Sequence, residues 1–141
     1  MRLWHYDLIE YLPKQQLIAQ WRELNSIYVK QDKHILINYI YEYEKVDLLI
    51  YSQIVLKEME RRGYKFNLKN YNQYFKGFEK GELEIAPEKW ICAGGLFENH
   101  MNFTYLKICC YNLYEKYWRG QKGFTIESIN FITKIMYNPR V

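Results

Sequence analysis

The sequence predicts an all-α fold: a compact single-domain helical bundle of three main helices plus a C-terminal helix and a long ordered connection. Four segments carry apolar residues at the three- and four-residue spacing that puts them on one face of a helix. Apolar residues make up 49% of the chain and aromatic residues 18%, with only three prolines, a composition that disfavours disorder. Because 141 residues is the usual size of one domain, we expect residues 1–141 to form a single domain.

The first helix is expected to begin at Pro13, a residue that suits a first helical turn. Its apolar residues recur at helical spacing: Leu17, Ile18, Trp21 and Leu24. On another side of this helix Arg22 and Glu23 flank the small Ala19. The pattern predicts a notch at Ala19 against which another group can lie.

The second helix is predicted over 46–62, where Arg61 and Arg62 fall in the last turn and Gly63 offers a left-handed C-cap. The segment before it, 34–43, is β-branched and aromatic with partial alternation, so a strand and tyrosine-rich helical turns fit nearly equally well.

Residues 64–100 read as the long connection, with glycine breaks, mixed charge and room for one short helix. Connections of this length are often functional, but the sequence leaves its role open. The third helix is expected to start near Asn99 or Met101 and to end at Arg119 and Gly120. The last helix follows Thr125 as N-cap and stops before Asn138-Pro139.

Composition and motifs restrict the function classes. The formal charge of +4 allows a polyanionic partner without identifying it. The three cysteines are odd in number and have no metal-type spacing, and the scattered histidines have none either, so we expect reduced thiols, no metal and no cofactor. Neither a signal peptide nor an apolar membrane span is recognisable, which predicts a cytoplasmic protein with no membrane partner.

One block of the sequence carries a specific resemblance. Residues 15–34 (QQLIAQWRELNSIYVKQDKH) present, without a gap, Gln15, Leu17, Ala19, Trp21, Arg22-Glu23-Leu24 and Lys33-His34. In this order and spacing the block resembles the first helix of the phage-type pyrimidine-dimer DNA glycosylases. Two weaker likenesses are the helix end ERRGYKFN within 51–67, and residues 114–120 (YEKYWRG), which look like the aromatic and basic C-terminal loop of that family.

The resemblance implies a glycosylase and abasic-site lyase that uses the α-amine of its first residue as nucleophile and the glutamate of its first helix as acid and base. The matching residues are Met1 and Glu23. It also implies binding to double-stranded DNA with a damaged or abasic site, and we expect the protein to act as a monomer. The matching DNA-binding residues are Arg2, Arg22, Lys33, His34, Lys116, Tyr117, Trp118 and Arg119.

Two departures from the family pattern keep an alternative open. The family exposes a threonine by removal of methionine, whereas methionine before a bulky residue such as Arg2 is normally retained, so the amine here is that of Met1. Ser26 also stands where the family has a further DNA-contacting arginine. The alternative is a catalytically inactive relative that serves as a nucleic-acid- or protein-binding helical module.

Overall fold

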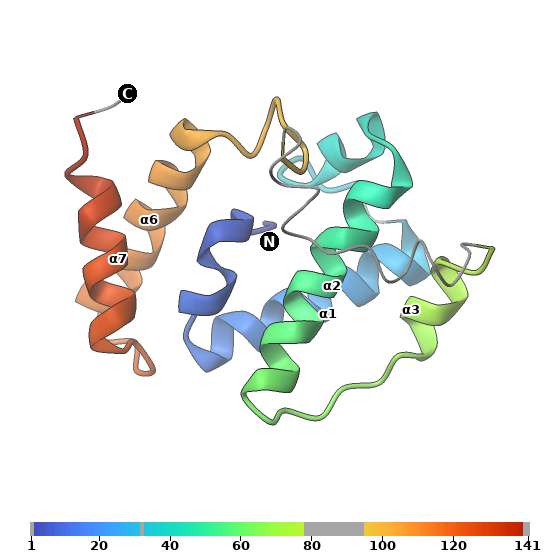
Figure 1. Ribbon diagram of the computed structural model, residues 1–141, viewed down its shortest axis with the longest axis horizontal. Helices are drawn as coiled ribbons and strands as arrows, with labels where there is room; N and C mark the ends of the chain where they lie inside the picture. Colours follow the sequence, from blue (N-terminus) through green and yellow to red (C-terminus); the bar gives the residue numbers. More distant parts are fainter. Residues whose placement is uncertain (1, 32, 78–94, 140–141) are drawn as a thin grey trace.

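The computed structural model describes residues 2–31, 33–77 and 95–139, and within these ranges every regular element is helical (Figure 1). The elements, in chain order, are the 3-10 helix η1 (Tyr6–Tyr11), α1 (Lys14–Lys30), the 3-10 helix η2 (Asn38–Glu42), α2 (Lys45–Arg61), α3 (Lys69–Tyr74), α6 (Phe103–Trp118) and α7 (Ile126–Met136). The predicted all-α class is confirmed.

Helix α1 starts directly after Pro13, which is its N-cap rather than its first residue. It ends where Gln31 adopts a left-handed backbone conformation, with φ of 49°, and donates its N–H to the carbonyl of Ile27 over 2.9 Å. The predicted apolar face is buried, with Leu17 and Leu24 fully enclosed. The 3.6-residue period therefore located this helix correctly.

Helix α2 ends in a Schellman motif. The N–H of Gly63, whose φ is +78°, donates to the carbonyl of Glu60, and the N–H of Tyr64 donates to that of Met59, both over 2.9 Å. The left-handed conformation is the reason a glycine stands there. The helix ends one residue before the predicted end because Arg62 is the C-cap.

The ambiguous segment 34–43 consists of a turn followed by η2, so its helical alternative is correct and the strand is not. The short helix expected within 64–100 is α3, while residues 78–94 of that connection lie outside the described residues. Helix α6 starts later than predicted because the Asn102 side chain accepts the N–H of Tyr105 and caps the helix there. Thr125 caps α7 as expected, by accepting the N–H of Ser128.

Two helical groups enclose the start of the chain. Helices α6 and α7 pack on each other as an antiparallel pair, and α1 packs on both α2 and α3 (Figure 1). The dark blue N-terminal segment with η1 lies between the two groups, and η1 contacts both α2 and α7. Trp21, Leu49 and Leu106, predicted to lie at the centre of the bundle, are all buried.

No helix of the described residues has the length and apolar character needed to cross a membrane.

Candidate active site

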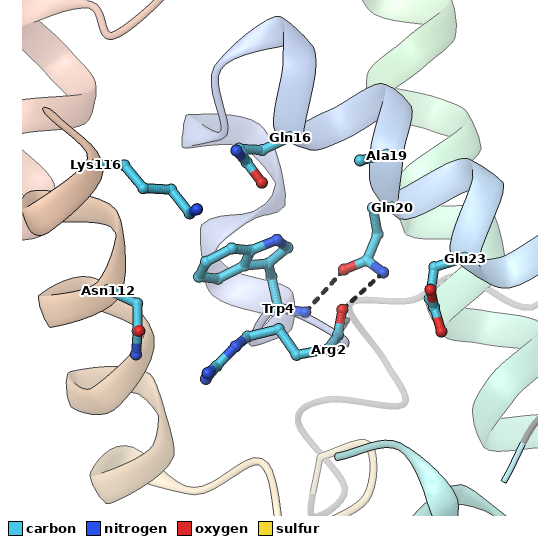
Figure 2. A pocket seen from close by; sticks show the side chains of 8 residues that line it. All are labelled: Arg2, Trp4, Gln16, Ala19, Gln20, Glu23, Asn112 and Lys116. Carbon is cyan, nitrogen blue, oxygen red and sulfur yellow. Dashed lines mark hydrogen bonds between the residues drawn. The ribbon is translucent and has the colours of Figure 1, made fainter. Parts of the chain in front are cut away.

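The first residues of the chain are held by side chains of α1 and α2. The N–H of Trp4 donates to Gln20 Oε1 over 2.8 Å, and Gln20 Nε2 donates to the carbonyl of Arg2 over 3.2 Å (Figure 2). The Tyr51 hydroxyl donates to the carbonyl of Trp4 over 2.6 Å and lies 3.0 Å from Gln20 Oε1. Gln20 is 2% exposed and Tyr51 is fully buried, so these buried polar groups find their hydrogen-bond partners in the protein itself.

The opposite side of the same segment is held by α6 and the residues before it. The Tyr105 hydroxyl donates to the carbonyl of Leu3 over 2.6 Å. The ring of His5 lies 3.1 Å from the carbonyl of Met101 through Nε2, and its Nδ1 accepts the N–H of Asp7 over 3.1 Å. These partners assign the proton of a neutral ring to Nε2. Burial lowers the pKa of His5 to about 4, although the Met101 carbonyl opposes this change.

A pocket of about 440 Å³ opens beside this anchored segment. Helix α1 forms one wall, α6 forms the other, and the N-terminal segment lies between them (Figure 2). The lining residues are Arg2, Trp4, Gln16, Ala19, Gln20, Glu23, Asn112 and Lys116. The notch predicted at Ala19 is therefore part of a real cavity.

Glu23 brings a carboxylate to this pocket from the helix turn that follows Ala19 and Gln20. Its side chain is half-buried, and its Oε1 atom is shielded from solvent. Met1 lies outside the described residues, but the neighbouring Arg2 lines the same pocket as Glu23. Arg2 and the Glu23 carboxylate, which the sequence paired only through a resemblance, thus share one cavity.

Two cationic side chains also line the pocket. The Arg2 guanidinium lies 5.6 Å from the centre of the Trp4 ring, and in Figure 2 it extends toward Asn112 on α6. Lys116 reaches toward the Trp4 ring from the next turn of α6 (Figure 2). A pair of cations beside a carboxylate and an indole suits a phosphate-bearing ligand with a flat ring.

The other predicted DNA-binding residues on or after α1 do not line this pocket. Arg22, Lys33 and His34 are exposed. Lys33 Nζ lies 5.9 Å from the ring centre of Tyr41, and His34 Nδ1 accepts the N–H of Leu36 over 3.2 Å. Of the predicted site residues that the structure describes, the pocket therefore brings together Arg2, Glu23 and Lys116.

The likeness to the family suggested that the aromatic and basic cluster 114–120 is a loop. The structure shows instead that it forms the last turns of α6 and their cap. Tyr117 and Arg119 are exposed and Trp118 is 71% exposed, while Arg119 pairs with Glu115 over 2.6 Å. Helical geometry turns Lys116 into the pocket and leaves Trp118 outside it.

Sequence reasoning missed Trp4, Gln20 and Asn112. A helical row joining Asn112 to Lys116, four residues apart, was the available signal for the α6 wall. No local sequence pattern pointed to Trp4 and Gln20, because their roles depend on a hydrogen bond between residues 16 positions apart.

In the described part of the chain no group of three or more His, Cys, Asp or Glu side chains is placed to hold a metal ion.

Comparison with known proteins identifies the family of the chain. No curated protein and no solved structure matches the chain. The family model described as pyrimidine dimer DNA glycosylase matches residues 1–72, which include the N-terminal segment, α1 and α2. Since this match covers half of the chain and contains both Arg2 and Glu23, the protein belongs to the pyrimidine dimer DNA glycosylase family, a family of DNA repair glycosylases.

Proposed function

We propose that this protein is a DNA glycosylase and abasic-site lyase that acts on pyrimidine dimers or related lesions through an imine with the α-amine of Met1. One observation carries the proposal: Arg2, the residue after the amine, lies in the same pocket as Glu23, and the backbone from Arg2 to Trp4 is held by buried side chains. This arrangement supports the proposal because it holds the residue next to the amine in the pocket that Glu23 lines.

The first step suits an α-amine better than a lysine. The reference pKa of an α-amine is about 8, so a useful fraction is neutral near pH 7. The amine nitrogen attacks C1′ of the deoxyribose. The glycosidic bond breaks, its electron pair leaves with the base, and the base takes up a proton. At a site that has already lost its base, water leaves C1′ instead.

Glu23 serves the steps that follow. As an acid, it gives a proton to the ring oxygen O4′ while the C1′–O4′ bond breaks and nitrogen forms a double bond to C1′. As a carboxylate, it then removes a proton from C2′. The electron pair moves toward the imine, the C3′–O3′ bond breaks, and the 3′ phosphate leaves with one strand of the DNA. No cofactor is required for this sequence.

The DNA substrate is proposed to cover the pocket and the exposed cations around it. Arg2 and Lys116 line the pocket, where a phosphate flanking the lesion is to bind. The exposed residues expected to contact the strands are Arg22, Lys33, His34, Tyr117, Trp118 and Arg119. The reacting sugar reaches the amine only in a kinked duplex, and weak stacking at the lesion lowers the cost of that kink.

Borohydride trapping on a duplex with one abasic site tests the proposal. Hydride addition to C1′ of the imine leaves a stable amine link between protein and DNA. The untagged protein, with its first residue verified by mass spectrometry, is expected to form this adduct on the peptide that contains residue 1. Glu23→Gln is expected to lose strand scission, whereas Glu60→Gln, a change on an exposed face of α2, keeps it. One residue added before Met1 should remove the adduct and spare binding.

A binding module without chemistry is the second candidate, favoured by Ser26 at a position where the family has an arginine. Salt-dependent binding to the duplex with no adduct at residue 1 would establish this candidate and reject the enzyme.

A further inference from the structure

The Gln20 amide forms a two-point contact with the segment that carries the proposed nucleophile. Its oxygen accepts from the N–H of Trp4 and its nitrogen donates to the carbonyl of Arg2, so one side chain bridges two residues of the N-terminal segment (Figure 2). Such a bridge needs a donor and an acceptor on the same side chain, and the uncharged amide of Gln20 supplies both.

Tyr51 completes the contact from a different helix. Its hydroxyl donates to the carbonyl of Trp4, and the same hydroxyl lies 3.0 Å from Gln20 Oε1. Because Gln20 belongs to α1 and Tyr51 to α2, the position of the segment is tied to the packing of these two helices. A segment held from two helices has little freedom to rotate about its own axis.

Gln20 and Glu23 lie three residues apart on α1, so the same helix positions both the N-terminal segment and the carboxylate. Three residues of an α-helix rise by about 4.5 Å and return to nearly the same face. Gln20 therefore holds the residue next to the amine, while Glu23 presents its carboxylate to the same pocket one turn later. Helix geometry therefore fixes the spacing between the residue that holds Arg2 and the residue that carries the carboxylate.

We propose that Gln20 and Tyr51 are positioning residues that orient the N-terminal amine toward Glu23 and the sugar. This inference rests on the proposed function, and it predicts a specific pattern: losing either residue slows formation of the imine but leaves DNA binding intact. Neither side chain needs to contact the DNA for this effect, since both are buried.

The test measures two quantities for each variant on an abasic duplex: the dissociation constant without borohydride, and the single-turnover rate of trapping at saturating protein. Gln20→Met keeps the length of the side chain and removes both hydrogen bonds, and Tyr51→Phe removes only the hydroxyl. Both variants are expected to trap about tenfold or more slowly, because small misplacements of reacting groups cost that much or more. Their dissociation constants should stay within about twofold of the original value.

Tyr28→Phe is the matched control. Tyr28 is also a buried tyrosine, and its hydroxyl donates to Ser52 on α2 rather than to the N-terminal segment. It should lower the melting temperature about as much as Tyr51→Phe and leave the trapping rate unchanged. Equal slowing by both tyrosine variants would overturn the inference, since the effect would then follow stability.

The outcomes separate this inference from the proposed function. If the original protein forms no adduct, the proposed function fails, whereas an adduct that forms equally fast in folded Tyr51→Phe rejects only the positioning role. Circular dichroism verifies folding first. Should Gln20→Met not fold, Tyr51→Phe, which removes a single oxygen atom, decides the matter.

Discussion

Tyr105 on α6 donates its hydroxyl proton to the carbonyl of Leu3 over 2.6 Å, a bond that spans 102 residues of sequence. It joins the part of the chain that matches the family, residues 1–72, to the half that lies beyond the match. Asn112 and Lys116, which complete the pocket, belong to that same helix. The second half of the chain is thus needed to close the site.

Loss of the Tyr105 hydroxyl should destabilise the fold. Tyr105→Phe leaves the Leu3 carbonyl, which belongs to a fully buried residue, without this donor, and we expect the free energy of unfolding to fall by about 1–2 kcal/mol. Urea unfolding followed by circular dichroism measures the change. Tyr111→Phe, on an exposed tyrosine of the same helix, serves as the control and should change little. Equal effects in the two variants would contradict the role of the bond.

Lys116 is expected to neutralise a DNA phosphate. Replacing it with alanine should weaken binding at all sequences and reduce the slope of log K against log salt by about one unit. Fluorescence anisotropy at several salt concentrations gives this slope. Lys134→Ala removes an exposed lysine of α7 that does not line the pocket, and its slope should match that of the original protein. An unchanged slope in Lys116→Ala would place the phosphate elsewhere.

Trp118 is expected to stack on a nucleobase. The side chain is 71% exposed and is supported by an edge contact with Tyr114, with ring centres 6.0 Å apart. Trp118→Ala should cost about 1–3 kcal/mol of binding free energy to lesion DNA and little stability. Tyr137→Ala is matched in exposure, at 73%, and should bind normally. The prediction fails if both variants bind alike.

His5 should make the fold sensitive to mild acid. The folded pKa of about 4 lies below the ordinary value of 6.5, so the unfolded chain binds more protons between these values. Stability is therefore fully present above pH 6.5 and falls as the pH drops toward 4, by about 3 kcal/mol at most. Asp7 Oδ2 lies 3.9 Å from His5 Nδ1, but burial of the ring is the larger influence on its pKa.

His5→Asn tests this sensitivity by guanidinium unfolding at pH 7, 6, 5 and 4. Asparagine keeps an acceptor for the N–H of Asp7 but does not titrate. The variant should be less stable at pH 7, because the contact with Met101 is lost, and its stability should depend less on pH. Parallel pH curves for the two proteins would assign the acid sensitivity to other groups.

The helices were predictable because their signals are local. The buried faces of α1 and α2 repeat every three to four residues, and Pro13, Gly63 and Thr125 mark helix boundaries through local stereochemistry. The segment 34–43 was ambiguous because its local signal is short: only Ile37 and Ile40 are buried, and two residues do not distinguish a helical turn from a strand.

The site was predictable only in part. Ala19 and Glu23 share a helical row, so the sequence indicated a notch with a carboxylate beside it. The α6 wall and the anchoring of the first residues arise from tertiary contacts, such as Gln20 with Trp4, that no local period encodes. For Tyr117 and Trp118 the helical period indicated the right local structure, a helix ending at Arg119 and Gly120, whereas the likeness to the family's C-terminal loop indicated the wrong one.

The anchoring of the first residues has a consequence for biosynthesis. Protein synthesis proceeds from the N-terminus, so Leu3 and His5 are made long before Tyr105 and Met101, the partners that hold them 102 and 96 residues later. A nascent chain therefore lacks a finished pocket until α6 has left the ribosome. Leu3 and His5 are thus among the first residues of this chain to be synthesised and among the last to gain their full set of contacts.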